Sequence, residues 1–409
     1  MSQEREISID SYRYYLPAEA IAKHPLPNRD DSRLLVYREG NVVHSNFREL
    51  PEQLPEHSWL VFNNTKVIQA RLKFAKPTGA VIEVFCLEPV DPAEHQLSFE
   101  SIHTCTWRCM VGNAKKWKSG SISLTTRIEG VDVRVDANCL EKGDEGFIVH
   151  FQWSAPGCSF AEIIESAGST PIPPYLNRSA ELSDKTRYQT IYSRDLGSVA
   201  APTAGLHFTE GMMRKLADRG IKSQELTLHV GAGTFVPVKN ENAREHAMHA
   251  ELVMVSLEFL ENWAAKEYLP IAVGTTSTRS METIYWLGVK IISGESLSPE
   301  GTEFRQWDNE SLPEDILLND SLKALIGWCK ESNLDQLRFT TSLMIVPGYR
   351  FRSIRGLITN FHQPGSTLLL LIAALIGEDW RELYQSALDQ SYRFLSYGDS
   401  SLLLPGSPD

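Results

Sequence analysis

Two histidines lie where loops of small residues meet predicted regular structure. His207 ends the Ala-, Thr- and Gly-rich loop Ser198–His207, and His229 lies near the end of the predicted strand Gln224–Val230, just before Gly231. Histidine exchanges protons near neutral pH, and small residues allow a ligand to approach the backbone closely. Loops at strand ends are also where α/β proteins place their chemistry. We therefore predict a ligand site here, with His229 and then His207 as acid–base candidates.

The glycine loop 231–233 raises the question of a dinucleotide or S-adenosylmethionine fingerprint. It follows a strand, but Thr234–Pro237 has the composition of extended chain, and Pro237 disfavours helix at the residue before it. The usual fingerprint needs a helix N-terminus to hold phosphate. The spacing alone thus favours a tight strand exit, with nucleotide binding as the alternative.

A second small-residue loop follows the predicted strand Leu269–Val273. It reads Gly274-Thr275-Thr276-Ser277-Thr278, and a helix is predicted from Arg279 to about Leu287. Among the segments of this chain, this combination of strand, polar loop and helix is best suited to an anion or a ribose.

Metal ligands have little support in the sequence. His246 and His249 are three residues apart, with Glu245 near the same face of a predicted helix, but no third ligand has matching spacing. The six cysteines are scattered, and only Cys105 and Cys109 are close together. We therefore expect reduced thiols, surface histidines at 246 and 249, and no metal.

The charge balance limits the possible partners. The 409 residues carry a net charge of −12, which argues against a general nucleic-acid coat protein but allows an RNA enzyme with local basic clusters. Lys115–Lys118 and the segment GYRFRSIRG are such clusters; strand alternation in the latter would place Arg350 and Arg352 on one face. A solvated surface is the alternative for both clusters.

Membrane insertion and export are not expected. The longest apolar run, Leu368–Ile376, is too short to cross a bilayer as a helix, and the N-terminal segment is polar and acidic. We expect a cytoplasmic protein without a membrane partner.

The elements that must position these residues have local signals. A helix over 210–219 begins after Thr209, a suitable N-cap, and stops at Gly220. Near the C-terminus, the strand Leu357–Phe361 leads into a turn, and Ser366 caps an apolar helix to Gly377. A further helix is predicted over 379–391, and one near Ser321–Lys330.

Between residues 80 and 153 the apolar period changes to two, and no helix is predicted. The expected strands are Ala80–Leu87, Gln96–Ile102, Trp107–Gly112, Ser121–Thr126, Val131–Val135 and Gly146–Trp153. Such a stretch inside an α/β chain predicts an inserted barrel or sandwich. The predicted fold class is therefore α/β, with a mixed sheet in a discontinuous domain (1–70 and 155–409) and an all-β barrel at 71–154. The polar span 289–340 has the composition of an insertion.

Eleven segments together resemble the S-adenosylmethionine:tRNA ribosyltransferase-isomerases of queuosine biosynthesis. They are YLPAEAIAKHPLPNRDDSRLLV, LVFNNTKVIQARL, PPYLNR, KTRYQTIYS, GSVAAPTAGLHFT, ELTLHVGAGTFVPV, MHAE, AVGTTSTR, PGYRFR, LITNFHQPGSTLLLL and YRFLSYGD. They cover most of the chain in the family's order, and the family's architecture is an α/β domain interrupted by a β-barrel. The chain departs from the family at Gln363 and Gly365, where Leu and Lys are usual, and in the length of 289–340.

The resemblance implies a reaction. The ribosyl moiety of S-adenosylmethionine moves to the aminomethyl group of a 7-deazaguanine at the tRNA wobble position and is isomerised to an epoxycyclopentanediol, with release of adenine and methionine. S-adenosylmethionine is then a co-substrate, no cofactor is expected, and the partner is a tRNA anticodon stem-loop bound by a monomer. The resemblance does not assign roles, but our candidate catalytic residues all lie inside matching motifs; they are His229, His207 and His249. The implied substrate-binding residues are Gly231, Gly233, Thr234, Gly274, Thr275, Thr276, Ser277, Arg279, Thr203, Asn360, His362, Arg187, Tyr188, Arg350 and Arg352.

Two other functions are kept as alternatives. A generic S-adenosylmethionine-dependent methyltransferase would release S-adenosylhomocysteine, and the absence of a predicted helix after the 231–233 loop argues against it. A non-catalytic tRNA-binding relative would bind without releasing adenine. Which residue is the general base stays open at this point.

Overall fold

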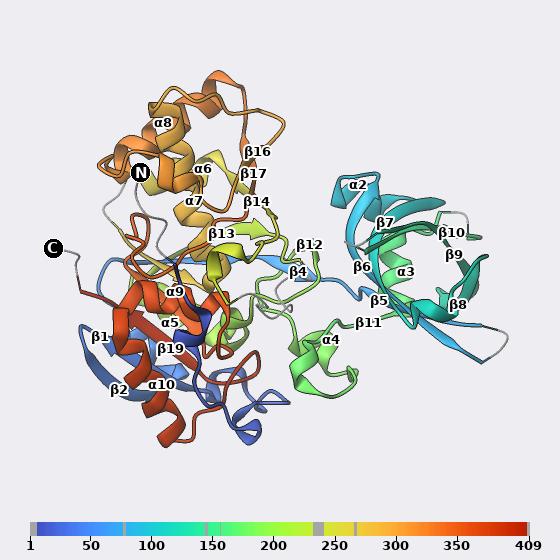
Figure 1. Ribbon diagram of the computed structural model, residues 1–409, viewed down its shortest axis with the longest axis horizontal. Coiled ribbons are helices and arrows are strands. Elements are labelled where there is room, and N and C mark those ends of the chain that lie inside the picture. Colours follow the sequence, from blue (N-terminus) through green and yellow to red (C-terminus); the bar gives the residue numbers. More distant parts are fainter. Residues whose placement is uncertain are drawn as a thin grey trace.

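The computed structural model describes residues 6–76, 79–143, 146–155, 157–231, 241–265 and 268–406. Within them the chain forms an α/β part around a ten-stranded sheet and a smaller part around a seven-stranded antiparallel sheet (Figure 1). In the view of Figure 1 the smaller part lies to one side, connected through β4 (Thr65–Val67), β5 (Arg71–Ala75), β11 (Gly168–Ser169) and β12 (Asp195–Ser198).

The ten-stranded sheet is mixed, with a parallel centre. Its order is β16 (Thr302–Phe304), β17 (Gln336–Thr341), β14 (Glu251–Ser256), β13 (Lys222–Leu228), β3 (Ser58–Asn63), β15 (Leu269–Val273), β18 (Gly356–Asn360), β19 (Ser400–Leu404), β1 (Arg33–Arg38) and β2 (Asn41–Asn46). Strands β13, β3, β15 and β18 are parallel to one another. The carboxyl ends of these four strands therefore lie along one edge of the sheet.

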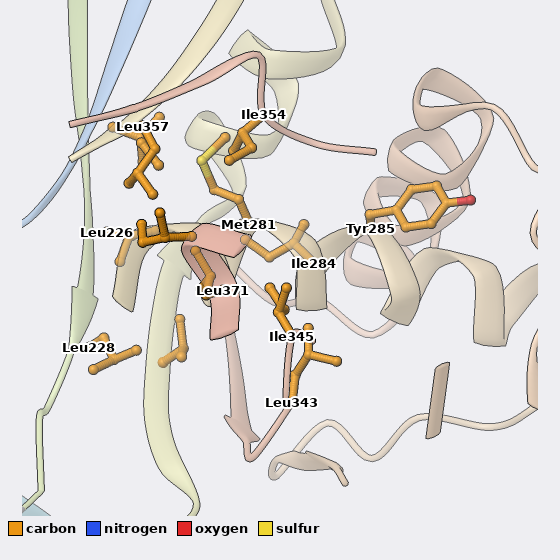
Figure 2. Close-up of a cluster of buried hydrophobic side chains, with 14 of the residues drawn as sticks. Leu226, Leu228, Met281, Ile284, Tyr285, Leu343, Ile345, Ile354, Leu357 and Leu371 are labelled. Carbon is orange, nitrogen blue, oxygen red and sulfur yellow. The ribbon is translucent and has the colours of Figure 1, made fainter. Parts of the chain in front are cut away.

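Helices cover both faces of this sheet. Leu226, Leu357 and other strand residues pack with Met281 and Leu371 in one apolar core (Figure 2), while Leu60 and its neighbours pack in a second one. The helices of the first core are α6 (Leu257–Ala265), α7 (Thr275–Ile292), α8 (Leu318–Glu331), α9 (Thr367–Ile376) and α10 (Trp380–Asp389), and the second core contains α5 (Glu210–Asp218). Shorter helices are α1 (Leu50–Gln53) and α4 (Asp184–Arg187). Alternate strand residues thus enter opposite cores, as a pleated sheet requires.

The predicted helix signals at 209 and 366 are confirmed. The Thr209 hydroxyl accepts a hydrogen bond from the Met212 amide at 3.2 Å, and Ser366 accepts one from Leu369 at 3.2 Å. Each hydroxyl satisfies a first-turn amide that has no partner inside its helix.

The span 289–340 is built into the large sheet. Strand β17 pairs with β14, and α8 packs on α7 at Gly288, where an added Cβ would lie 2.2 Å from the Ser321 carbonyl oxygen. A larger residue at this position would therefore push the two helices apart.

The seven-stranded sheet has its own core. Its order is β11 (Gly168–Ser169), β5 (Arg71–Ala75), β6 (Val81–Asp91), β7 (Thr104–Gly112), β10 (Gly146–Trp153), β9 (Val131–Gly143) and β8 (Ile122–Ile128). Trp107, Phe151 and Phe160 are buried at its centre, Phe160 coming from α3 (Phe160–Ala167). A separate two-stranded ladder pairs β4 (Thr65–Val67) with β12 (Asp195–Ser198). The order of this sheet is open, so its closure into a barrel stays a prediction.

One predicted strand of this part is a helix. Residues His95–Glu100 form α2, not the strand expected over Gln96–Ile102. The Gln96 amide donates to the Glu100 carboxylate at 3.0 Å, one helical turn away, and Phe99 packs on Trp107 with ring centroids 5.3 Å apart. Leu97 is 52% exposed while Phe99 is buried, so these two residues do not share the one buried face that a strand would give them.

Three local predictions around the site are also wrong. Helix α7 begins at Thr275, so Thr275, Thr276 and Ser277 form its first turn and are not a loop. Residues 246–250 are not helical, and Tyr349–Arg355 forms no strand. The latter segment is shaped instead by the buried Glu282 carboxylate, which accepts hydrogen bonds from the amide and hydroxyl of Ser353, the Arg352 amide and the Tyr349 hydroxyl.

Candidate active site

A cavity of about 250 Å³ opens at the carboxyl ends of the parallel strands. Val230 lies just beyond β13, Gly274 follows β15, and Asn360 ends β18. Ligands of open α/β sheets bind at this edge. The predicted site residues in the cavity wall are Tyr188, Thr203, His249, Gly274, Thr275, Thr276, Arg279, Asn360 and His362, with Gln363 and Gly365 beside them. The structure thus brings together residues from eight of the eleven motifs.

The N-terminus of α7 forms one wall. Gly274 has φ +93°, a conformation that disfavours other residues, and its amide donates to the Ile358 carbonyl at 2.8 Å. Thr275 and Thr276 then face the cavity at the positive end of the helix dipole. Ser277 does not line the cavity, because it is buried and its hydroxyl donates to the Val273 carbonyl at 3.0 Å.

The opposing charges in the wall are Glu251 and Arg279. Glu251 is buried, and its carboxylate accepts a hydrogen bond from Arg279 and lies 3.3 Å from His249 Nε2. Burial raises the pKa of Glu251, but Arg279, His249 and the Gly231 backbone outweigh it and hold that pKa below its usual value. Glu251 is therefore ionised and orients both His249 and Arg279.

Asn360 connects the cavity to His207. Its side-chain amide donates to His207 Nε2 at 3.2 Å, and His207 Nδ1 lies 2.9 Å from the Ser32 hydroxyl. Burial lowers the pKa of His207 to about 4, so the ring is neutral. With Nε2 accepting, the proton sits on Nδ1 and the Asn360 amide group is fixed. His207 itself lies behind the cavity wall.

Several buried polar atoms of the wall have no partner among the described residues. They are Asn360 Oδ1, Arg279 Nε and the Tyr188 hydroxyl. His362 is satisfied, with Nε2 3.0 Å from the Thr359 hydroxyl, and burial lowers its pKa to about 3. Unpaired buried polar groups are destabilising, so a polar ligand that reached these atoms from the cavity would be favoured.

His229 lies outside this cavity, at the junction with the smaller part. Its Nδ1 is 3.1 Å from the Thr65 hydroxyl, and its ring stacks on His95 of α2 with centroids 4.7 Å apart. Burial and then His95 lower the pKa of His229 to about 3. Gly197 allows this position, because a Cβ there would lie 2.6 Å from the His229 ring. The ring is thus neutral and held between the two parts of the chain.

The remaining predicted residues are dispersed. Arg187 lies in a neighbouring hollow. Gly231 lies next to His249, because a Cβ added to Gly231 would be 3.5 Å from the His249 ring. Arg352 pairs with Glu314 at 3.2 Å and Arg350 is exposed nearby. Lys115, Lys116 and Lys118 are exposed on the smaller part around the buried Trp117. Gly233 and Thr234 lie outside the described residues.

Sequence reasoning missed Glu251 as a site residue. It lies two positions after His249 in MHAE, where its buried side chain meets Arg279 across 28 residues of sequence. A carboxylate so close to a candidate catalytic histidine was the available signal. In the described part of the chain, no group of three His, Cys, Asp or Glu side chains could hold a metal ion.

Comparison with known proteins places these features in a family. The family model described as "Queuosine biosynthesis protein" matches residues 9–403. A protein of Halothermothrix orenii named S-adenosylmethionine:tRNA ribosyltransferase-isomerase is 38% identical over 97% of this chain and 100% of its own. One of the same name from Desulfitobacterium hafniense is 36% identical over 97% and 100%. A crystal structure of S-adenosylmethionine tRNA ribosyltransferase from Thermotoga maritima has 27% identity, covers 96% of this chain and 99% of its own, and gives a TM-score of 0.45. None of the described helices is long and apolar enough to span a membrane.

Proposed function

This chain belongs to the family of queuosine biosynthesis proteins, and we infer from that membership that it is an S-adenosylmethionine:tRNA ribosyltransferase-isomerase. It transfers the ribosyl moiety of S-adenosylmethionine to the 7-aminomethyl-7-deazaguanine of tRNA and isomerises it, giving epoxyqueuosine-tRNA, adenine and methionine. The observation that carries this function is the family match over residues 9–403, and the cavity formed by the same motifs agrees with it.

The reaction sets three demands on the site. A base must remove the acidic proton at C5′ beside the sulfonium, an acid must protonate the departing adenine, and the attacking amine must be neutral. Room is also needed for two leaving products. The cavity has a volume of about 250 Å³ and a partly polar wall, as a small-molecule site requires.

We assign proton transfer at the cavity to His249. Among the three predicted catalytic histidines it alone lines the cavity wall, and the ionised Glu251 orients it at 3.3 Å. A carboxylate behind a histidine stabilises the imidazolium that forms when the ring accepts a proton. Arg279 keeps Glu251 ionised, and the amides at the start of α7 with Thr275 supply a site for an anionic group of S-adenosylmethionine.

His207 acts from behind the wall in this scheme, whereas His229 lies outside the cavity and stacks on His95. His207 fixes the Asn360 amide so that its unpaired Oδ1 accepts a hydrogen bond from the substrate. His229 remains the candidate suggested by the sequence, and its variants are the direct test of whether it transfers a proton or holds the two parts of the chain together.

The RNA partner is the tRNA anticodon stem-loop. Arg350, Arg352 and the Lys115–Lys118 cluster remain proposed phosphate contacts, with the smaller part of the chain acting as a barrel domain beside the catalytic α/β domain. We propose a monomer acting in the cytoplasm, without a resident cofactor.

Nucleoside analysis tests the function. The protein is incubated with S-adenosylmethionine and tRNA carrying the aminomethyl deazaguanine, the tRNA is digested, and its nucleosides are weighed by mass spectrometry. The proposal requires the epoxyqueuosine mass together with adenine. Formation of S-adenosylhomocysteine would indicate a methyltransferase, and tRNA binding without adenine release would indicate a non-catalytic relative.

A further inference from the structure

A small hollow beside the cavity is lined by three arginines, Arg29, Arg187 and Arg393. Ser396 lies in the walls of both the hollow and the cavity. His207 lines the hollow and bonds to Asn360 of the cavity at 3.2 Å. The two spaces are therefore separated by about one layer of side chains.

Two of these guanidinium groups are held by backbone carbonyls alone. Arg29 donates to the Leu206 and Thr186 oxygens at 3.0 and 2.9 Å, and Arg187 donates to two carbonyls of the segment 26–27 at 2.6 and 3.0 Å. Within the described ranges, neither forms an ion pair with a carboxylate. The third, Arg393, forms an ion pair with the Asp399 carboxylate at 3.5 Å.

The hollow therefore carries uncompensated positive charge in a protein of net charge −12. Burial lowers the pKa of Arg29, and the nearby positive charge of Arg187 lowers it further. Arg187 Nε is also buried without a partner among the described residues. Two half-buried like charges are destabilising unless an anion joins them.

The position of the cluster is fixed by the chain around it. The Phe394 amide donates to the Ala20 carbonyl at 2.7 Å, and the Ala22 amide donates to the Phe394 carbonyl at 3.2 Å. Leu395, in the cavity wall, has φ +68°, an unfavourable conformation for leucine. Arg393 and Ser396 flank this strained residue. The loop thus holds a basic group on one side and a cavity-lining group on the other.

We propose that this arginine hollow binds a phosphate of the tRNA strand adjacent to the wobble nucleotide, while the wobble base enters the cavity. The inference rests on the proposed function. The hollow has about 20 Å³ of free space, enough for a single oxygen atom, so one phosphate oxygen inserts and the others stay outside. A guanidinium carries five N–H groups, so Arg29 and Arg187 can each donate to this oxygen as well as to their carbonyls. The carboxylate of S-adenosylmethionine is the other anion that shares this chemistry.

The test is the salt dependence of tRNA binding by Arg29→Gln and Arg29→Lys, measured with unmodified tRNA and no turnover. Gln retains a donor for the backbone carbonyls but removes the charge. We expect Arg29→Gln to weaken tRNA binding about tenfold and to reduce the slope of log K against log salt by about 0.7 to 0.9, the value of one phosphate contact. Arg29→Lys should keep the slope, because it keeps the charge.

Arg305→Gln is the matched control, because Arg305 is 76% exposed, and it should bind tRNA as the wild type does. If Arg29→Gln fails to fold, Arg393→Gln takes its place in the same titration. Unchanged tRNA affinity and slope would overturn the proposal, as would a loss of S-adenosylmethionine affinity with tRNA binding intact. Failure of the proposed function is distinct, since it would appear as a wild-type protein that releases no adenine.

Discussion

Replacing Arg279 by Met should destabilise the protein in a pH-dependent way. The change leaves the Glu251 carboxylate, 2% exposed, with His249 Nε2 at 3.3 Å as its remaining side-chain partner. Burial then dominates and raises the pKa of Glu251, so the group takes up a proton in the folded state. Met keeps much of the apolar length of Arg, so lost packing contributes little.

The magnitude of the loss follows from the free energy needed to protonate Glu251 at a given pH. A glutamate has an ordinary pKa of about 4.3, and each pH unit above it adds about 1.36 kcal/mol to the free energy of protonation. The variant should therefore lose about 3.7 kcal/mol of unfolding free energy at pH 7 but only about 1 kcal/mol at pH 5. In the wild type the contribution of Glu251 changes with pH in the opposite direction. Its pKa is lowered in the folded state, so it stabilises the protein above pH ~4.3 and loses this contribution as the pH falls through the folded pKa.

The assay is urea unfolding at pH 5 and pH 7, followed by tryptophan fluorescence. The double variant Arg279→Met/Glu251→Gln removes both charges and should recover more than half of the loss, without pH dependence. A loss that is equal at both pH values, or a double variant as unstable as the single one, would refute the reasoning that Arg279 keeps a buried carboxylate ionised.

Further predictions concern His229, His207 and the residues that contact them. Gly197→Ala should destabilise the protein more than Gly120→Ala, because both have positive φ but only the first meets the His229 ring; equal melting temperatures would contradict this. His229→Gln should reduce adenine release less than tenfold and lower the melting temperature, because the ring lies outside the cavity and stacks on His95; a loss of about two to four orders of magnitude would show that it transfers a proton. Asn360→Leu removes both the donor to His207 and the unpaired Oδ1 acceptor, and it should cost about 1–3 kcal/mol of stability in urea and most of the turnover. Normal turnover would rule out the proposed acceptor role of Asn360.

Features set by neighbouring residues in sequence were predictable. The caps at Thr209 and Ser366 are local hydrogen bonds, and the buried strand Leu269–Val273 was predicted with the bounds that the structure has. The strand predicted at Gln96–Ile102 was wrong. Leu97 and Phe99 alternate with polar residues as in a strand, but only Phe99 is buried, where it packs on Trp107, and Leu97 is exposed.

Groupings made by long-range contacts were not predictable in the same way. Arg29 and Arg187 are 158 positions apart by number, and each is held by carbonyls of a distant segment. Likewise the placement of His229 against His95 depends on how the smaller part packs, which no local pattern encodes. The motifs identified the cavity-lining residues, but the partners of each side chain required the fold.

The most direct test of the central claim is the fate of two labels in S-adenosylmethionine. The protein is incubated with modified-base tRNA and either ribose-labelled or methyl-labelled S-adenosylmethionine, and label in the tRNA is counted. Ribosyl transfer predicts that the ribose label enters the tRNA while the methyl label leaves with methionine. Methyl label in the tRNA, or neither label with tRNA still bound, would contradict it.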